Sequence, residues 1–124
     1  VNDLHKAGVT AGVAMNPETD VMRIVDVAPS CEMVLVMTVH PGFGGQEFIP
    51  EMAHKVRQVR ELVGPAIRVQ VDGGISAQTA PEVVRCGADT LVIGSAIFGR
   101  KDRAEAIEEI RTAIGLQTPS PVSA

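Results

Sequence analysis

Three apolar runs in this sequence each lead directly into a glycine-rich segment. They read VMTVHPGFGGQ (residues 36–46), VDGGI (residues 71–75) and VIGSAIF (residues 92–98). Backbone N–H groups can hold a phosphate only where no side chain blocks its approach, and the positive end of a following helix adds attraction. One glycine cluster is typical of an ordinary turn, but three clusters that each follow an apolar run predict a phosphate-binding site.

Hydrophobic periodicity predicts that strands and helices alternate along the chain. Continuous valine-rich runs indicate buried strands, and apolar residues at steps of three and four indicate helices. We expect strands at residues 10–15, 33–39, 67–71 and 90–93, and helices at residues 21–27, 50–63, 79–87 and 102–114. Residues 4–7 read as the end of an earlier helix that stops at Gly8. Four successive strand-helix units predict an α/β fold with a parallel sheet.

The expected helices also carry signals for their ends and their faces. Pro29 is expected to end the first of these helices, and Thr79 with Glu82 matches the capping-box pattern. One face of the helix at 50–63 is expected to be buried, through Met52, Val56, Val59 and Val63. Its basic residues are expected to be solvated, namely Lys55, Arg57 and Arg60. The last helix is expected to bury Ile107, Ile110 and Ile114.

Composition argues against nucleic-acid and membrane partners. The formal net charge is −4 and the only aromatic residues are three Phe, so neither phosphate-backbone binding nor base stacking is favoured. No apolar stretch approaches the roughly 20 residues of a membrane helix, and no charged-then-apolar leader begins the chain. Cys31 and Cys86 lack any metal-binding or redox spacing, and we expect buried free thiols in a cytoplasmic protein.

Taken together, VMTVHPGFGGQ, VDGGI and GSAIF resemble the ribulose-phosphate 3-epimerase family, TIM-barrel isomerases of the pentose phosphate pathway. The resemblance runs from about residue 1 to residue 115 and implies the C-terminal half of a (β/α)8 barrel at residues 1–116. Residues 117–124 are expected to be a disordered tail. The family usually has Asn or Glu where this chain has His40, and we do not build a metal site on that histidine.

The resemblance implies that the chain belongs to an enzyme that interconverts D-ribulose 5-phosphate and D-xylulose 5-phosphate. Two carboxylates on opposite faces of the substrate move a proton at C3, and a divalent metal stabilises the enediolate. Asp72 matches one acid/base and one metal ligand of this pair. Among the divalent metals, Zn²⁺ is expected in preference to Fe²⁺, Mn²⁺ or Co²⁺. The other ligands and the second acid/base belong to barrel segments absent from this chain.

The remaining site residues also follow from the resemblance. The phosphate-binding positions correspond to Gly42, Phe43, Gly44, Gly45, Gly73, Gly74, Gly94 and Ser95. The same glycines would suit tight strand-to-helix turns, which is compatible with phosphate binding because such turns present their amides. Met37 matches a methionine that packs over the active site, although a strand methionine is more often simple core. His5 and His54 are expected to be surface residues.

Strand alternation predicts which side chains face the interior of the barrel. If Asp72 points into the lumen, then Gln70 and Arg68 do so too, and no strand offers Arg68 an obvious partner. The apolar lumenal positions of the second strand are Met33, Leu35 and Met37. Leaving these side chains and two sheet edges in water is costly, so we expect the missing N-terminal half, a second copy or another chain to cover them.

Two alternatives remain open from the sequence. The first is another phosphate-binding barrel enzyme, such as a thiamine-phosphate synthase or an enzyme of tryptophan or histidine biosynthesis. The second is a non-catalytic half-barrel that dimerises and at most binds phosphate. We expect the 124-residue chain alone to be inactive, because only Asp72 of the catalytic pair is present.

Overall fold

In the computed structural model, which describes residues 1–40, 42 and 47–115, one sheet of four parallel strands forms the centre of the protein. The strands are β1 (Gly12–Met15), β2 (Met33–Met37), β3 (Arg68–Asp72) and β4 (Thr90–Val92), adjacent in that order. The helices are α1 (Asn2–Lys6), α2 (Met52–Val63), α3 (Ala80–Arg85), α4 (Ser95–Phe98) and α5 (Arg103–Ala113). The expected α/β fold with a sheet of four parallel strands is confirmed.

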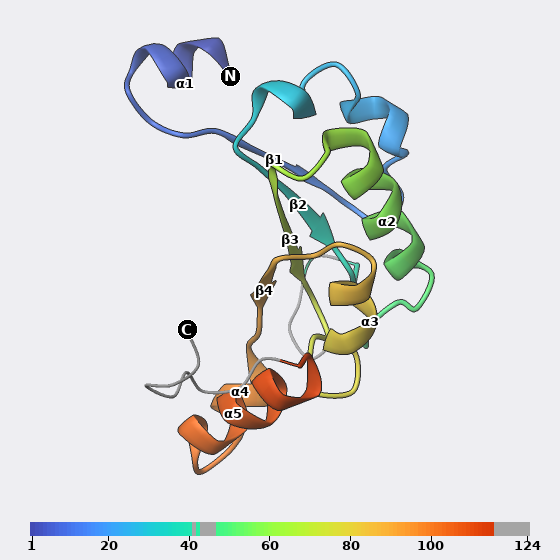
Figure 1. The fold of residues 1–124 in the computed structure, drawn as a ribbon, viewed down its shortest axis with the longest axis vertical. Helices are drawn as coiled ribbons and strands as arrows, with labels where there is room; N and C mark the ends of the chain where they lie inside the picture. Colours follow the sequence, from blue (N-terminus) through green and yellow to red (C-terminus); the bar gives the residue numbers. More distant parts are fainter. Residues whose placement is uncertain (41, 43–46, 116–124) are drawn as a thin grey trace.

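The core lies between the sheet and the helices α2 and α3 (Figure 1). The alternate strand residues that face these helices are fully buried, namely Val34, Val36, Val69 and Val71. On α2 the predicted apolar face is confirmed at Met52, Val56 and Val59, while Val63 is only partly buried. This alternation follows because successive side chains of a strand point to opposite faces of the sheet.

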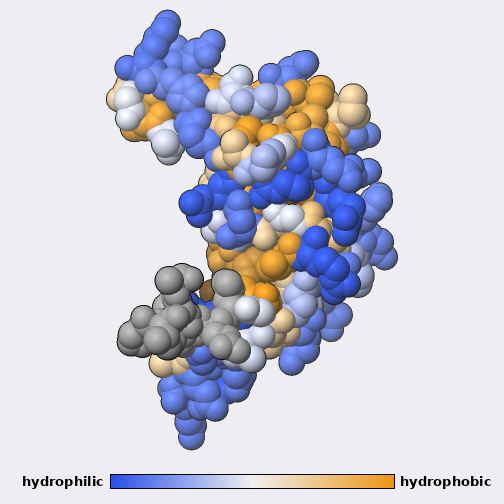
Figure 2. Space-filling model, viewed as in Figure 1, coloured by the Kyte–Doolittle hydropathy of each residue, from blue (hydrophilic) through white to orange (hydrophobic). Residues whose placement is uncertain are grey.

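No described helix covers the opposite face of the sheet (Figure 1). The predicted lumenal residues of β2 are only partly buried, namely Met33, Leu35 and Met37. Val92 on β4 is 38% exposed. In the same view the space-filling surface is hollowed on the side away from α2 and α3, and apolar residues border the hollow (Figure 2). The predicted assignment of faces is therefore confirmed.

Arg68 departs from expectation, because the sequence offered it no partner on this face. Its Nη1 donates to Thr90 Oγ1 at 3.0 Å, from the adjacent strand. Thr90 is in register with Gln70, two residues beyond Arg68, so the long arginine side chain reaches its neighbour diagonally. The expectation failed because this hydroxyl acceptor lies on the next strand along the chain, 22 positions away, where the sequence did not mark it as a partner.

The segment between β1 and β2 also differs from the predicted helix at residues 21–27. It forms two short 3₁₀ helices, η1 (Val21–Ile24) and η2 (Ala28–Ser30), and Pro29 lies inside the second. Asp20 caps η1, since its Oδ1 accepts from the Met22 N–H at 2.9 Å. Pro29 occupies the first turn of η2, where its missing N–H costs no hydrogen bond.

Three smaller predictions were wrong, and one short helix was missed. Thr79 begins α3 without a capping hydrogen bond, because its hydroxyl contacts the preceding turn instead. Ile107 is 39% exposed, and Ala106 is the buried neighbour in its place. Of the residues in β1, which was predicted as buried, only Met15 is buried, because Gly12 and Ala14 lie in register with Met33 and Leu35 on the open face. The short helix α4 follows β4 directly and was not foreseen. The expected tail at residues 117–124 lies outside the described residues.

Two of the three basic residues of α2, Lys55 and Arg60, are not simply solvated, whereas Arg57 is exposed as expected. Lys55 Nζ donates to the carbonyls of Pro17 and Thr19, at 2.6 and 2.7 Å. Arg60 donates to three backbone carbonyls and to Asp89. Arg57 is the most weakly engaged of the three, with Nη2 3.7 Å from Cys86 Sγ. The expectation was wrong because the partners lie on loops that sequence periodicity does not place.

Both cysteines are buried and free, as the sequence predicted. Within the described residues, no helix is long and apolar enough to cross a bilayer.

Candidate active site

Asp72 is the last residue of β3 and stands at the C-terminal edge of the sheet. Its neighbours in register are Met37 on β2 and Val92 on β4. Because Val71 is fully buried against the helices, Asp72 points to the open face, where it is partly exposed. Met37, Asp72 and Val92 therefore form one row across the open face, with the carboxylate between two apolar side chains. In this row the predicted Met37 lies beside the predicted acid/base, and both roles stay predictions.

Gly73 and Gly74 follow Asp72 with φ angles of +122° and +68°. A Cβ at Gly73 would lie 2.5 Å from Val39 Cγ2, and one at Gly74 would lie 2.5 Å from the Phe48 nitrogen. Glycine is thus required at both positions by backbone conformation and by the close approach of neighbouring chain. The turn after β3 packs directly against the two segments that flank the loop after β2.

The other predicted phosphate-binding residues follow β2 and β4. Gly42 is exposed and has a φ of +135°. Gly94 is the N-cap of α4, and Ser95 is the first residue of that helix. Since the strands are parallel and in register, these loops share the C-terminal edge of the sheet with Asp72 (Figure 1). The predicted residues Phe43, Gly44 and Gly45 lie outside the described residues.

A metal ion would find only part of a ligand set here. Among the described residues, no three His, Cys, Asp or Glu side chains lie close enough to hold a metal together. Asp72 can supply one carboxylate ligand at the open edge of the sheet, and a stable site for a transition metal needs three or more such groups. The residues present therefore fit one ligand position of a divalent metal but do not form a site by themselves.

His40 has a partner that the sequence did not reveal. Its Nδ1 lies 2.6 Å from Glu18 Oε1, on the loop after β1. The pKa of Glu18 is lowered, first by a hydrogen bond from its own backbone and then by the adjacent His40. We expected a loop histidine without a partner, and the 22 residues that separate the two side chains explain why this pair was missed.

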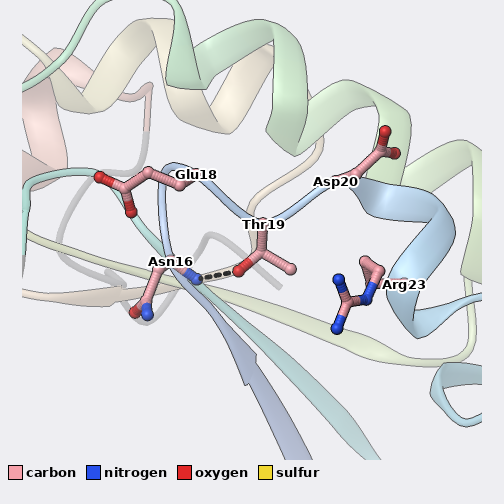
Figure 3. Close-up of a pocket in the computed structure, with 5 residues that line it drawn as sticks. All are labelled: Asn16, Glu18, Thr19, Asp20 and Arg23. Atoms are coloured by element: carbon pink, nitrogen blue, oxygen red, sulfur yellow. Dashed lines mark hydrogen bonds between the residues drawn. The ribbon is translucent and has the colours of Figure 1, made fainter.

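A cavity of about 400 Å³ lies at the C-terminal end of β1, and Glu18, the residue in contact with His40, is part of its lining (Figure 3). Its lining comes from the loop after β1 and from η1, namely Asn16, Glu18, Thr19, Asp20 and Arg23. The Asn16 N–H donates to Thr19 Oγ1 at 3.2 Å and closes the turn. None of the predicted site residues lines this cavity, so it is separate from the row that contains Asp72.

Sequence reasoning missed two threonines that hold the turn after β3. Thr38 is fully buried at the end of β2, and its hydroxyl contacts the Gly73 carbonyl. Thr79 Oγ1 donates to the Gly74 carbonyl at 2.9 Å. Thr38 did leave one signal, since it is the only polar residue in the apolar run at 33–39. For Thr79 the sequence pattern pointed to a helix cap instead.

Comparison with known proteins identifies relatives across almost the whole chain. The ribulose-phosphate 3 epimerase family matches residues 1–98. The ribulose-phosphate 3-epimerase of Bacillus subtilis is 44% identical over 112 residues, which are 87% of this chain and 52% of that protein. The Mycobacterium leprae protein of the same name is 40% identical over 121 residues, 95% of this chain and 54% of its own. The chain thus spans about half the length of the curated relatives it matches.

Solved structures support the fold. A 3-hexulose-6-phosphate synthase from Salmonella typhimurium aligns with a TM-score of 0.63 at 24% identity, over 91% of this chain and 53% of its own. A thiamine phosphate pyrophosphorylase from Pyrococcus furiosus aligns with a TM-score of 0.53 at 22% identity, over 91% and 63%. These neighbours are TIM-barrel enzymes, so the four-stranded sheet corresponds to part of such a barrel.

Proposed function

We propose a function from the family of this chain, which belongs to the ribulose-phosphate 3-epimerases. The chain would form the C-terminal half of a barrel that interconverts D-ribulose 5-phosphate and D-xylulose 5-phosphate. The observation that carries this proposal is the position of Asp72. It ends a lumenal strand at the C-terminal edge, beside Met37 and directly before two glycines with positive φ. Active sites of TIM barrels are built at this edge.

In this proposal Asp72 exchanges the proton at C3 on one face of the substrate. Inversion of a carbon needs removal of a proton from one face and return from the other, so a second acid/base on the opposite side is required. That group would come from the barrel segments that this chain does not contain. When bound, a divalent metal supplies positive charge that stabilises the enediolate oxygens, and Asp72 would be one of its ligands.

The substrate phosphate would lie at the turns after β3 and β4. Gly73, Gly74 and Gly94 can present backbone N–H groups without a side chain in the way, and Ser95 adds the N–H of the first residue of α4. With the phosphate at this edge, the carbon chain of the substrate would extend over the row that contains Asp72. Met37 and Val92 on either side would limit the water that reaches the carboxylate.

The partner of this half would be the remainder of the barrel or a second copy of the same half. Four of its open-face positions carry large apolar side chains, at Met33, Leu35, Met37 and Val92. Each buried side chain of this size is worth about 1.5–3 kcal/mol. Both outer strands, β1 and β4, also have an unpaired edge among the described residues. Covering this face would therefore stabilise the half-barrel and complete the catalytic pair.

The test is an epimerase assay on D-ribulose 5-phosphate with added Zn²⁺. Two proteins are compared: the 124-residue chain, and the same chain fused behind the N-terminal half of the Bacillus subtilis relative. We expect activity only in the fusion. Asp72→Asn should lower kcat of the fusion by about 10²–10⁴-fold, because it removes the proton acceptor. Asp3→Asn, on α1 where no residue is buried, is the matched control and should leave kcat unchanged.

Two results would contradict the proposal. One is a folded fusion that does not turn over ribulose 5-phosphate with Zn²⁺, Fe²⁺, Mn²⁺ or Co²⁺. The other is an Asp72→Asn fusion with the parent's kcat. Activity of the 124-residue chain alone, lost in Asp72→Asn, would keep the reaction but show that a second copy supplies the missing acid/base.

A further inference from the structure

Thr38 joins the end of β2 to the end of β3 and the turn after it through two hydrogen bonds, and a third links it to the loop after β2. Its hydroxyl donates to the Gly73 carbonyl, and its N–H donates to the Asp72 carbonyl at 2.9 Å. Its own carbonyl accepts from the Ile49 N–H at 2.9 Å, on the far side of the loop after β2. Thr38, which makes these three hydrogen bonds, is fully buried.

These bonds fix the direction of the neighbouring amides. The peptide bonds of the described chain are trans, and in a trans peptide the N–H points away from the C=O of the same plane. The hydrogen bond from the Thr38 N–H to the Asp72 carbonyl therefore fixes the direction of the Gly73 N–H. The hydrogen bond from the Thr38 hydroxyl to the Gly73 carbonyl fixes the direction of the Gly74 N–H in the same way. Both N–H groups consequently point away from Thr38.

A second threonine extends the same arrangement by one residue. Thr79 Oγ1 donates to the Gly74 carbonyl, which directs the Ile75 N–H, and the same oxygen accepts from the Ser76 N–H at 2.9 Å. Three successive carbonyls of this turn are thus held by threonine donors. The N–H groups of Gly73, Gly74 and Ile75 are therefore oriented by those contacts, and successive backbone N–H groups of a turn can bind an anion.

We propose that Thr38 is a positioning residue for this turn: its hydroxyl orients the Gly74 N–H toward the substrate phosphate and steadies the backbone that carries Asp72. This inference rests on the proposed function for the identity of the anion. A purely packing role does not account for the hydroxyl. Valine has nearly the same shape as threonine. Val34 and Val36, which face the helices from β2, show that valine suits this buried environment.

The hydroxyl is tested by three substitutions. Thr38→Val keeps the shape and removes the donor, whereas Thr38→Ser keeps the donor and removes a methyl group. Thr90→Val is the matched control, because it removes a hydroxyl from the N-terminal end of β4, away from the turn. If Thr38→Val does not fold, Thr38→Cys replaces it, since a thiol is a poor donor of similar size.

The first readout is the ¹⁵N order parameter of the Gly74 N–H in the labelled 124-residue chain. We expect about 0.85 in the parent, in Thr38→Ser and in Thr90→Val, and a value below about 0.6 in Thr38→Val. Val69 and Val71 in β3 should remain rigid in all of them. A rigid Gly74 in Thr38→Val, or an equal loss of order throughout β3, would overturn the inference.

The second readout is steady-state kinetics of the fusion with D-ribulose 5-phosphate. Thr38→Val should lower kcat/KM by about 10–100-fold, because displacement of a positioned group by about 1 Å can cost 10²-fold. Thr38→Ser should restore it to within about threefold of the parent. Equal values for the valine and serine variants would also overturn the inference. An inactive parent fusion would instead contradict the proposed function, and the order parameters would still decide the role of Thr38.

Discussion

Arg60 joins three segments at the N-terminal end of the strands, and its replacement should destabilise the whole sheet. Nε and Nη2 donate to the Gly87 carbonyl at 2.9 and 2.8 Å. Nη1 donates to the carbonyls of Gly64 and Ile67, at 2.8 and 2.7 Å, and Nη2 also reaches Asp89 at 3.0 Å. One guanidinium therefore ties the end of α2 to the connection before β3 and to the connection before β4.

The size of the effect follows from the groups that would lose their donor. In Arg60→Met three backbone carbonyls lose a hydrogen bond that is worth about 1 kcal/mol each. The bridge to Asp89 adds at most about 1 kcal/mol, because Asp89 is 46% exposed and solvent screens it. We therefore expect a loss of about 3 kcal/mol in the free energy of unfolding. That is a large fraction of the roughly 5–15 kcal/mol typical of a domain.

Urea denaturation followed by circular dichroism, at one fixed protein concentration, measures this loss. Arg57→Met is the matched control, because Arg57 lies on the same helix and makes only a 3.7 Å contact with Cys86 Sγ. It should change the free energy of unfolding by less than about 0.5 kcal/mol. The reasoning is refuted if Arg60→Met lies within 0.5 kcal/mol of the parent, or if Arg57→Met loses as much.

Two further predictions concern the same end of the sheet. Gly87→Ala should lower the free energy of unfolding, measured in urea, by about 1–3 kcal/mol, because φ is +121° and the new Cβ would lie 2.7 Å from Arg60 Cβ. Gly115→Ala should lower it by less, because Gly115 also has a positive φ but no neighbour near the new Cβ. The pKa of Glu32 is lowered, first by the Ala11 N–H and then by His5, so its stabilising contribution is present above about pH 4.5 and is lost as the pH falls below that value. Glu32→Gln should therefore flatten the pH dependence of unfolding in that acidic range, and an unchanged acid limb would contradict this assignment.

The fold was predictable because it depends on short-range periodicity. Valines at alternate positions of β2 and β3 are buried, and the residues between them face the open side, as strand geometry requires. The strand order also follows from chain order, since each strand lies beside the next. The sequence failed where periodicity carries little information, at the two 3₁₀ helices and at the one-turn helix α4.

The candidate site was predictable only in part. The glycine motifs located Asp72 and the turns around it, because glycine is demanded by backbone conformation and that demand is visible in the sequence. The contacts of Thr38 with Gly73 and of Arg60 with Gly87 were not visible, since each joins a side chain to a backbone carbonyl 27 to 35 positions away in the sequence. A threonine in a strand and an arginine on a helix look ordinary until the loops they contact are placed.

The stabilising contacts of Arg60 and the proposed functional residues lie at opposite ends of the same strands. Arg60 binds the Ile67 carbonyl just before β3 begins, whereas Asp72 is the last residue of β3 and Thr38 contacts the Gly73 carbonyl just after it. Four steps along a strand span about 13 Å, and effects separated by more than about 7–10 Å usually add without coupling. A loss of stability in Arg60→Met should therefore leave the Gly74 N–H as rigid as in the parent while the protein is folded. Conversely, loosening of the turn in Thr38→Val should leave the contacts of Arg60 in place, so the two tests answer separate questions about one sheet.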